Sequence, residues 1–191
     1  MAAQSRHKIA VFASGYGSNF EVITRAAQSG EIPADVVLMV CDKPSARVCS
    51  LADAMGVEKF VFSAKDYPTK SDYEREIVRR CRECGIELIC LAGYMRIVGE
   101  ELLNAYKGRI INIHPSLLPA FAGARAIEQA MEYGVKVYGA TIHYVDETLD
   151  GGKIIAQQAI EYEGDNIEEL TALIHAAEYK LYIKTLQKLL K

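Results

Sequence analysis

Asn112, His114 and Asp150 are the residues whose types and spacing could do chemistry. Asn112 and His114 stand two apart at the end of the apolar run Ile110–Ile113, so in a strand both side chains point to one face. An amide and an imidazole aimed at one point can bind an oxyanion and transfer a proton. Asp150, in a loop with two glycines, could orient and charge the imidazole. The alternative is a strand-end pair that only caps neighbouring backbone groups.

A second candidate is the glycine-rich segment SGYGSN, residues 14–19, which lies between an apolar run and a helical pattern. Glycines permit a tight turn, and the free amides of a helix N-terminus bind anions. Phe20 replaces the third glycine of a dinucleotide fingerprint, the Gly-Lys-Ser/Thr of a Walker A motif is missing, and Asp42 precedes a turn-like Lys43-Pro44. The segment is therefore either a monophosphate site or an ordinary strand-to-helix turn.

Short apolar runs that alternate with amphipathic stretches must position these residues. Unbroken apolar runs are typical of strands buried on both faces of a mostly parallel sheet. The predicted strands are Lys8–Ala13, Asp35–Val40, Lys59–Phe62, Leu88–Ala92, Ile110–Ile113, Gly139–Val145 and Ile154–Glu161. The predicted helices are Asn19–Gln28, Ala46–Ala54, Ser71–Arg82, Gly99–Asn104, Arg125–Tyr133 and a long one over Asn166–Leu190, capped by Asp165 or Asn166.

This order predicts an α/β fold: a Rossmann-like, doubly wound, mostly parallel sheet with a long closing helix. The last two strands are joined by a short segment around Asp146-Glu-Thr-Leu-Asp-Gly-Gly152, which has too few residues for a helical crossover, so we expect an antiparallel C-terminal strand pair. Open α/β sheets bind ligands at the carboxyl ends of their strands. We therefore expect the loops after Ala13, Ala92, Ile113 and Val145 to converge on one site.

Composition sets limits on the class of protein. The 191 residues are 50% hydrophobic and 25% charged, without a repeat or linker, which predicts a single domain over 1–191. The net charge of −3 argues against a general nucleic-acid binder. The N-terminal residues carry no apolar run long enough for a signal peptide, and no window reaches the length of a membrane span, so we expect a cytoplasmic protein that binds no membrane.

The five cysteines suit a reducing compartment, with Cys41 and Cys90 expected to be buried in apolar runs. Cys81 and Cys84 form a lone CxxC at the end of a helical stretch. Zinc would need a second ligand pair, and a redox pair would stand at a helix N-terminus, so we interpret both as structural thiols. The four histidines have no metal-ligand spacing with carboxylates or cysteines, and we expect no metal.

Several strings together resemble a known family, the folate-dependent formyltransferases. They are Asn112-Ile-His-Pro-Ser-Leu-Leu-Pro119, Gly139-Ala-Thr-Ile-His143 and Leu149-Asp150-Gly-Gly152. The glycine-rich loop, Leu91-Ala-Gly-Tyr-Met-Arg-Ile97 and the segment from His175 through Glu178 to Tyr182 resemble the branch that formylates glycinamide ribonucleotide. The resemblance runs from Ile9 to about Tyr182. It implies an enzyme, a transferase of purine biosynthesis, with two small-molecule substrates: glycinamide ribonucleotide and the cosubstrate 10-formyltetrahydrofolate.

The resemblance also implies roles for particular residues. Asn112, His114 and Asp150 would be catalytic, and substitution of each by Ala would cut turnover strongly. Gly17, Ser18 and Asn19 would bind the substrate phosphate, and Glu178 its ribose hydroxyls or amine; otherwise Glu178 is a solvated helix glutamate. The folate would contact Lys70, Leu91, Met95, Arg96, Ile97, Val98 and Val145. Without the resemblance, Met95, Ile97 and Val98 would be assigned to core packing, and Thr141 either fixes a water or is a satisfied strand hydroxyl.

Three positions depart from the family pattern. Lys70 stands where some relatives have an Arg that meets the folate glutamate tail, and Lys lacks the bidentate geometry of Arg. Arg125 stands where a His is expected, and His175 where others have Lys or Gln. These departures leave the folate-tail preference and part of the pocket open.

Other functions remain as alternatives. Methionyl-tRNA formyltransferase carries an extra C-terminal domain, and formyltetrahydrofolate hydrolase an extra N-terminal one. Sugar-amine formyltransferases usually lack the glycine loop. A non-catalytic folate- or nucleotide-binding module needs no Asn–His–Asp set, and a nicotinamide dehydrogenase does not fit the glycine loop. Either a monomer or a homodimer is compatible with the sequence.

Overall fold

The computed structural model describes residues 6–191; the first five residues, part of the segment in which we expected no signal peptide, lie outside the described residues. The strands are β1 (His7–Phe12), β2 (Ala34–Cys41), β3 (Lys59–Val61), β4 (Leu88–Leu91), β5 (Ile110–His114), β6 (Val137–Tyr144) and β7 (Ile154–Glu161). The helices are α1 (Ser18–Ser29), α2 (Arg47–Ala54), α3 (Lys70–Glu83), α4 (Glu100–Ala105), α5 (Ala126–Tyr133) and α6 (Ile167–Leu189), with one 3-10 turn, η1 (Ala64–Asp66).

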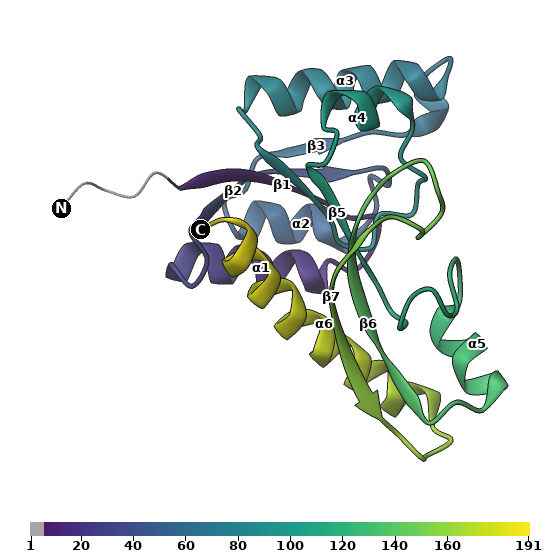
Figure 1. The fold of residues 1–191 in the computed structure, drawn as a ribbon. Coiled ribbons are helices and arrows are strands. Elements are labelled where there is room, and N and C mark those ends of the chain that lie inside the picture. The colour runs from purple at the N-terminus through teal and green to yellow at the C-terminus, as the bar shows by residue number, and fades with distance from the viewer. Residues whose placement is uncertain (1–5) are drawn as a thin grey trace.

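The seven strands form one sheet in the order β3-β2-β1-β4-β5-β6-β7 (Figure 1). The first five strands of this order run parallel, and β6 and β7 are antiparallel to their neighbours. The order reverses direction between β1 and β4, so the loops that leave these two strands diverge there and open a crevice. The predicted α/β fold, the antiparallel C-terminal pair and the long closing helix are confirmed.

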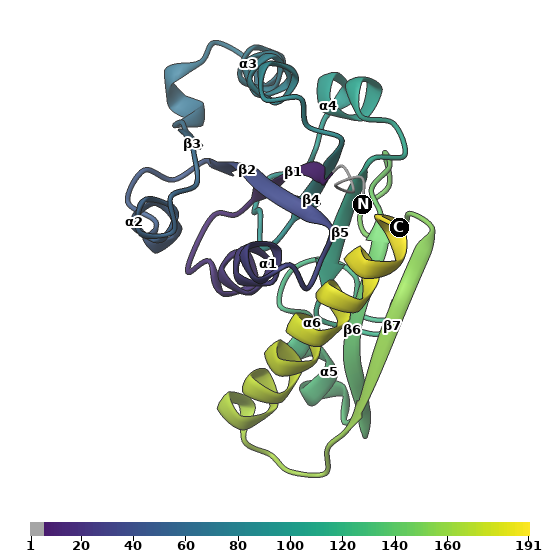
Figure 2. The same cartoon turned by 90° about the vertical axis from the view of Figure 1, so that its left-hand side faces the viewer.

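Two hydrophobic cores cover the two faces of the parallel sheet. On one face α1, α2 and α6 pack through side chains such as Phe20, Val48 and Tyr182. On the other face α3 and α4 pack through Ile77 and Leu102. Figure 2 shows the two helix groups on opposite sides of the strands. Strands covered on both faces need apolar residues throughout, which explains the unbroken runs in the sequence.

Helix α6 ties the far end of the chain to the parallel sheet. Asn166 caps it by accepting a hydrogen bond from the Glu169 amide at 2.9 Å, which confirms one of the two predicted caps. Further along, the fully buried Tyr182 hydroxyl donates to the Leu91 carbonyl at 2.9 Å. This bond holds α6 against the end of β4, beside the crevice. Within residues 6–191, none of the helices is both long and apolar enough to cross a membrane.

The cysteines lie where the sequence placed them. Cys41 and Cys90 are fully buried, and Cys81 is buried in α3, whose last turn ends at Cys84. All five thiols are free. Burial raises the pKa of Cys81 and of Cys90 to about 12, the opposite of the lowered pKa of a reactive thiol. The interpretation as structural thiols fits these environments.

Candidate active site

A pocket of about 790 Å³ opens at the carboxyl ends of the parallel strands. The loops that we expected to converge all line it, together with two residues of α6. Its lining includes Gly15, Gly17, Ser18, Asn19, Lys43, Leu91, Met95, Arg96, Ile97, Val98, Asn112, His114, Arg125, His143, Val145, Asp150, His175 and Glu178. The predicted site residues therefore share one pocket, with the exception of Lys70.

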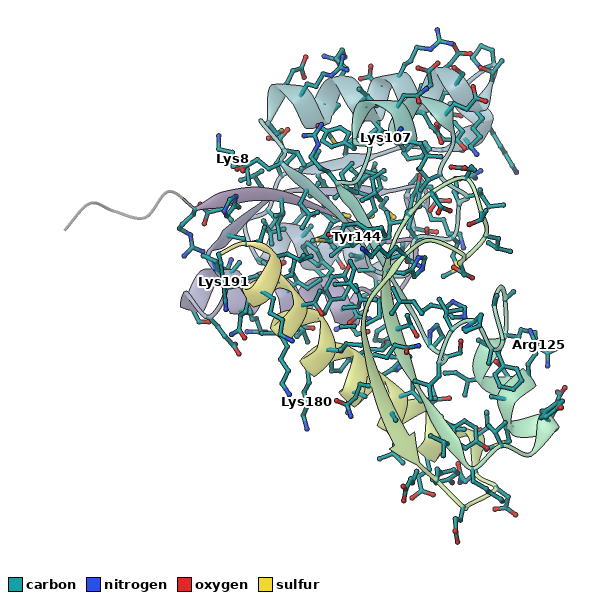
Figure 3. All side chains as sticks on the ribbon, in the orientation of Figure 1. Lys8, Lys107, Arg125, Tyr144, Lys180 and Lys191 are labelled. Atoms are coloured by element: carbon teal, nitrogen blue, oxygen red, sulfur yellow. The ribbon has the colours of Figure 1, made fainter. Side chains whose placement is uncertain are left out.

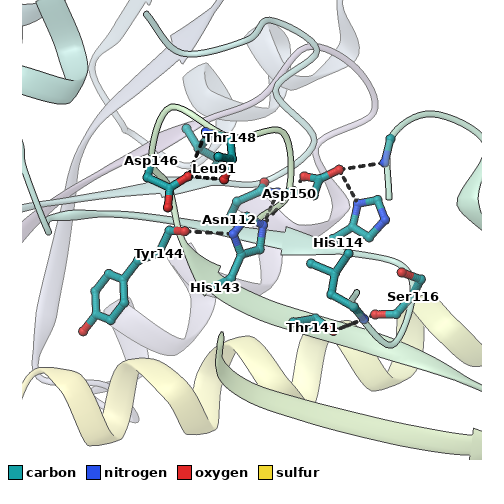
Figure 4. A network of polar contacts seen from close by, with 12 residues as sticks. Leu91, Asn112, His114, Ser116, Thr141, His143, Tyr144, Asp146, Thr148 and Asp150 are labelled. Atoms are coloured by element: carbon teal, nitrogen blue, oxygen red, sulfur yellow. Dashed lines mark hydrogen bonds and ion pairs between the residues drawn. The ribbon is translucent and has the colours of Figure 1, made fainter. Parts of the chain in front are cut away.

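Asn112, His114 and Asp150 all line this pocket, and their side chains lie close together (Figure 4). His114 is 5% exposed; its Nδ1 lies 3.4 Å from Asp150 Oδ2, and its Nε2 lies 2.8 Å from the carbonyl oxygen of Phe121. Both ring nitrogens thus face hydrogen-bond acceptors. An imidazolium, which carries two N–H donors, satisfies both neighbours at once. The arrangement can hold a cationic donor beside the Asn112 amide.

His143 is a site residue that sequence reasoning did not single out. In the β5–β6 ladder it stands directly opposite Asn112. His143 Nδ1 lies 2.9 Å from the Tyr144 carbonyl oxygen, which can only accept, so Nδ1 carries a proton. His143 Nε2 lies 3.2 Å from Asn112 Nδ2, which can only donate, and 3.7 Å from Asp150 Oδ1. The imidazole therefore fixes which way the Asn112 amide points. Only the strand register reveals this pairing, since the two residues are 31 apart in sequence.

The loop after β6 reaches the site by a route that the sequence did not predict. Because β6 is antiparallel to β5, this loop starts at the amino end of β5, where the Val145 amide donates to the Ile110 carbonyl. The loop curls back, and Gly123 then donates its amide to Asp150 Oδ2 at 2.8 Å. A Cβ on Gly152 would lie 1.8 Å from the Tyr144 carbonyl oxygen, so the return of the chain requires glycine there.

The glycine-rich loop forms one end of the pocket. Gly17 is the N-cap of α1 with φ 84°, a conformation that favours glycine, and a Cβ there would lie 2.7 Å from Val48 Cγ2. The tight approach of α2 to this loop includes a hydrogen bond from the Val48 amide to the Gly15 carbonyl. Ser18 and Asn19, the first two residues of α1, line this end of the pocket, and the free amides of a helix N-terminus suit an anion. The exposed Lys43 lines the same pocket and adds a local cation.

Glu178 lies beneath this loop. It is 5% exposed, and Asn19 Nδ2 donates to its Oε2 at 3.1 Å. Burial raises the pKa of Glu178 to about 7, against the smaller opposing effect of the Asn19 bond. The alternative of a solvated helix glutamate is therefore wrong. A carboxyl group with this pKa can both accept and donate near neutral pH.

The other end of the pocket is apolar. Met95 and Ile97 are each 69% exposed, so they are not core residues, whereas Val98 is buried in the core beside α4. Leu149 of the opposite loop is 63% exposed. Large apolar side chains left open around a pocket are typical of a site for a ligand with apolar surface.

The three residues that differ from the family pattern lie away from the Asn112, His114 and Asp150 side chains. Lys70 is exposed at the start of α3 with its Nζ 3.9 Å from Glu74 Oε1, and it does not line the pocket. Arg125 is the exposed N-cap of α5 (Figure 3); it lines the edge of the pocket, and its guanidinium lies 3.4 Å from Glu132. His175 lines the pocket, and burial lowers its pKa.

Thr141 is fully buried and its hydroxyl is saturated. It donates to the Ser116 carbonyl at 2.7 Å and accepts from the Leu118 amide and from Gln157 Nε2, each at 3.0 Å. These bonds favour the interpretation as a satisfied strand hydroxyl, which holds the segment after His114 against β6. Among residues 6–191, groups of three or more potential metal-binding side chains are not found.

Comparisons with known proteins agree with this geometry. A model of the family described as "formyl transferase" matches residues 7–186. Phosphoribosylglycinamide formyltransferase of Bacillus subtilis is 50% identical over 96% of this chain and 94% of its own length. The trifunctional purine biosynthetic protein adenosine-3 of Drosophila melanogaster is 39% identical over 99% of this chain, which spans 14% of that longer protein.

Solved structures lead to the same family. Glycinamide ribonucleotide transformylase 1 from Geobacillus kaustophilus superposes with a TM-score of 0.95 at 50% identity, over 97% of this chain and 100% of that one. Phosphoribosylglycinamide formyltransferase from Bacillus halodurans gives a TM-score of 0.93 at 50% identity, over 96% and 95% of the two chains. With its sequence, fold and pocket all in agreement, this chain belongs to the formyl transferase family.

Proposed function

We propose that this chain is an enzyme that transfers the formyl group of 10-formyltetrahydrofolate to the amine of glycinamide ribonucleotide, a step of purine biosynthesis. The observation that carries the proposal is the His114–Asp150 pair beside Asn112, in the middle of a pocket with an anion site at one end and an apolar surface at the other. Relatives of 50% identity that bear the corresponding name support the choice of acceptor.

The nucleotide would lie between the glycine-rich loop and α6. Its phosphate would accept hydrogen bonds from the amides at Gly17, Ser18 and Asn19. Glu178 would accept from the ribose hydroxyls or from the amine. Since its pKa is raised to about 7, it can accept from a donor without carrying a full charge into the protein at neutral pH.

The pterin would lie between the segment Leu91–Val98 and Val145. Backbone groups of Arg96 and Val98 would hold its polar edge, and Met95 and Ile97 would cover its ring. Lys70 would meet only the distal glutamate of the folate, since it lies outside the pocket. The formyl group would then project toward Asn112 and His114 at the pocket centre.

Transfer is direct in this proposal. The neutral amine attacks the formyl carbon, and a new C–N bond forms as the carbonyl oxygen becomes an oxyanion. Asn112, oriented by His143, and the protonated His114 donate to that oxygen. The C–N bond to the folate then breaks, and the proton lost by the amine passes to the departing folate nitrogen through His114 or a water held by Asp150.

The hydrogen bond between His114 Nε2 and the Phe121 carbonyl must be exchanged during the proposed reaction. For Nε2 to donate to the oxyanion, it exchanges the neutral carbonyl of Phe121 for the charged substrate oxygen. Charge-assisted hydrogen bonds are about twice as strong as neutral ones, so this exchange favours the transition state over the empty site. Asp150 holds the other side of the ring throughout.

The test is a spectrophotometric assay of folate release by the purified protein with a 10-formyl folate donor, run with and without glycinamide ribonucleotide. Release that requires the nucleotide supports the proposal. Release without it would identify a hydrolase instead. No release under either condition would refute the proposed acceptor and direct the search to sugar amines or to a binding role.

A further inference from the structure

Asp42 is a buried carboxylate at the end of β2 that the transfer chemistry does not use. It is 5% exposed and accepts hydrogen bonds from two sides. The Ser14 hydroxyl donates to its Oδ1, and Arg96 Nε donates to its Oδ2 at 2.8 Å. Ser14 Oγ in turn accepts from the Met95 amide at 2.8 Å.

These four residues join three loops at the point where the sheet order reverses. Ser14 begins the glycine-rich loop after β1, Asp42 follows β2, and Met95 and Arg96 belong to the segment after β4. A backbone bond from the Ser14 amide to the Gly93 carbonyl, 3.0 Å long, runs beside them. One carboxylate therefore lies between the loop at the anion end of the pocket and the segment at its apolar end.

The hydrogen bonds and the ion pair of Asp42 compensate for the burial of its charge. A buried carboxylate costs free energy unless it is paired and fully hydrogen-bonded, and Asp42 has both an arginine and a hydroxyl. The Arg96 guanidinium also lies 5.7 Å from the centre of the Tyr73 ring, within the range of a cation–π contact. The Arg96 side chain is thus turned back toward β2 and α3, which fixes the backbone of the segment around it.

We propose that Asp42 is a positioning residue for both ligands: through Ser14 and Arg96 it fixes the glycine-rich loop and the segment Leu91–Val98 relative to each other. The identity of the two ligands rests on the proposed function. Asp42 touches neither ligand in this proposal. It sets the distance between the anion site and the pterin site, and so the affinity of the pocket for the formyl folate rather than the rate of the chemical step.

Asp42→Asn tests the proposal, with Asp35→Asn as its control. Asp35 lies near the other end of the same strand and also accepts from an arginine Nε, that of Arg6 at 2.7 Å, but its side chain is 51% exposed. In Asp42→Asn the new side chain can still accept one hydrogen bond, but its NH₂ group then faces the second donor. In the unliganded protein, hydrogen exchange measured by mass spectrometry should be about tenfold faster in peptides covering residues 91–99 for Asp42→Asn and unchanged for Asp35→Asn.

Steady-state kinetics gives the second readout. We expect Asp42→Asn to raise the KM for the formyl folate about tenfold while kcat stays within about twofold. A purely structural role would instead lower kcat per milligram, through loss of folded enzyme, and leave KM unchanged. Should Asp42→Asn fail to fold, Arg96→Gln removes the same ion pair from its partly exposed side.

The two readouts separate this inference from the proposed function. If wild-type protein releases no folate, the proposed function fails, and the exchange measurement still decides the role of Asp42. If exchange of residues 91–99 and KM in Asp42→Asn both match those of Asp35→Asn, the positioning role is overturned.

Discussion

The side-chain nitrogen Nδ2 of Asn19 lies 3.1 Å from the carboxylate oxygen Oε2 of Glu178, and this contact joins the first turn of α1 to the middle of α6. The carboxyl group is unusual for a glutamate, because burial raises the pKa of Glu178 to about 7. The oxygen Oδ1 of Asn19 is itself buried without a hydrogen-bond partner within the described part of the chain. Such a group costs free energy until a ligand donor reaches it, which suits a substrate hydroxyl or amine.

Glu178 should make stability depend on pH. Its pKa is higher in the folded state than in the unfolded chain, so its carboxyl destabilises the fold as pH rises from about 4 through 7. Glu178→Gln removes this effect: relative to wild type, the variant should gain up to roughly 3 kcal/mol of unfolding free energy between pH 4.5 and pH 8. Urea unfolding at both pH values measures it.

The exposed Glu168, in the first turn of the same helix, is the matched control. Glu168→Gln should show little pH-dependent difference from wild type. Equal differences for the two variants at both pH values would contradict the burial argument for Glu178.

Asp150→Asn should lower kcat by about two to three orders of magnitude, the scale of one oxyanion-stabilising group. Asp150 has φ 50°, a conformation that asparagine also tolerates, and Asn can still accept from the Gly123 amide. The loop is preserved and the negative charge facing His114 is lost. Steady-state turnover measures the effect, with circular dichroism as a check on folding.

The double variant tests whether Asp150 acts through His114. If it does, His114→Ala combined with Asp150→Asn should be about as slow as His114→Ala alone. The exposed Asp165, in the loop before α6, gives the control Asp165→Asn, which should turn over as wild type does. If the factor by which the double variant lowers kcat equalled the product of the two single factors, His114 and Asp150 would act independently.

Gly17→Ala should be more damaging than Gly30→Ala. Both glycines have positive φ, 84° and 80°, at the two ends of α1, but only a Cβ at Gly17 meets a neighbour, Val48 at 2.7 Å. Backbone strain of about 1 kcal/mol is expected for both. Gly17→Ala should lose about 1–2 kcal/mol more in urea unfolding, and it should raise the KM for glycinamide ribonucleotide about tenfold because the amides of α1 shift.

Gly30→Ala separates strain from the clash because the space around it is open. It lies at the far end of α1, about 18 Å from the loop by the rise of a helix. An unchanged KM in both variants would show that the loop amides do not hold the nucleotide.

Native protein should react with Ellman's reagent at one thiol. Cys84 is half-buried, and the other four cysteines are buried. With its pKa raised to about 12 against an ordinary 9, Cys81 has about a thousandfold less thiolate near neutral pH. Absorbance at pH 8 should therefore show one fast equivalent, which Cys84→Ser removes, and five after denaturation. If two thiols of the native protein reacted equally fast and Cys84→Ser removed both signals, Cys81 and Cys84 would instead be a reactive CxxC pair.

The sequence predicts the strands well because a doubly covered sheet demands long apolar runs, and those runs end where the loops begin. Ile154–Glu161 matches β7 at both ends, and Leu88–Ala92 differs from β4 by one residue. Asn112 and His114 stand out since polar residues are rare at the end of such a run. The extent of the predicted single domain and the roles of the site residues stay predictions.

What sequence could not supply depends on pairing across the fold. In the sequence, His143 belongs to a predicted apolar strand and has no visible partner. Only the β5–β6 register shows that it lies opposite Asn112. The sequence places Asp42 just before a turn. Only the fold shows that Ser14, after β1, and Arg96, after β4, donate hydrogen bonds to it. Nor does helical spacing show that Glu178 is buried, because that depends on how α6 packs on α1.

The hydrogen bond from Tyr182 to the Leu91 carbonyl has a consequence for synthesis of the protein. The ribosome makes the glycine-rich loop and β5 long before α6, yet Glu178 and this tyrosine arrive together on that helix. A nascent chain therefore carries an open, unfinished pocket until α6 docks. One helix turn carries both Glu178, which we propose binds the nucleotide, and the tyrosine that anchors the end of β4, so docking of α6 completes the fold and the pocket together.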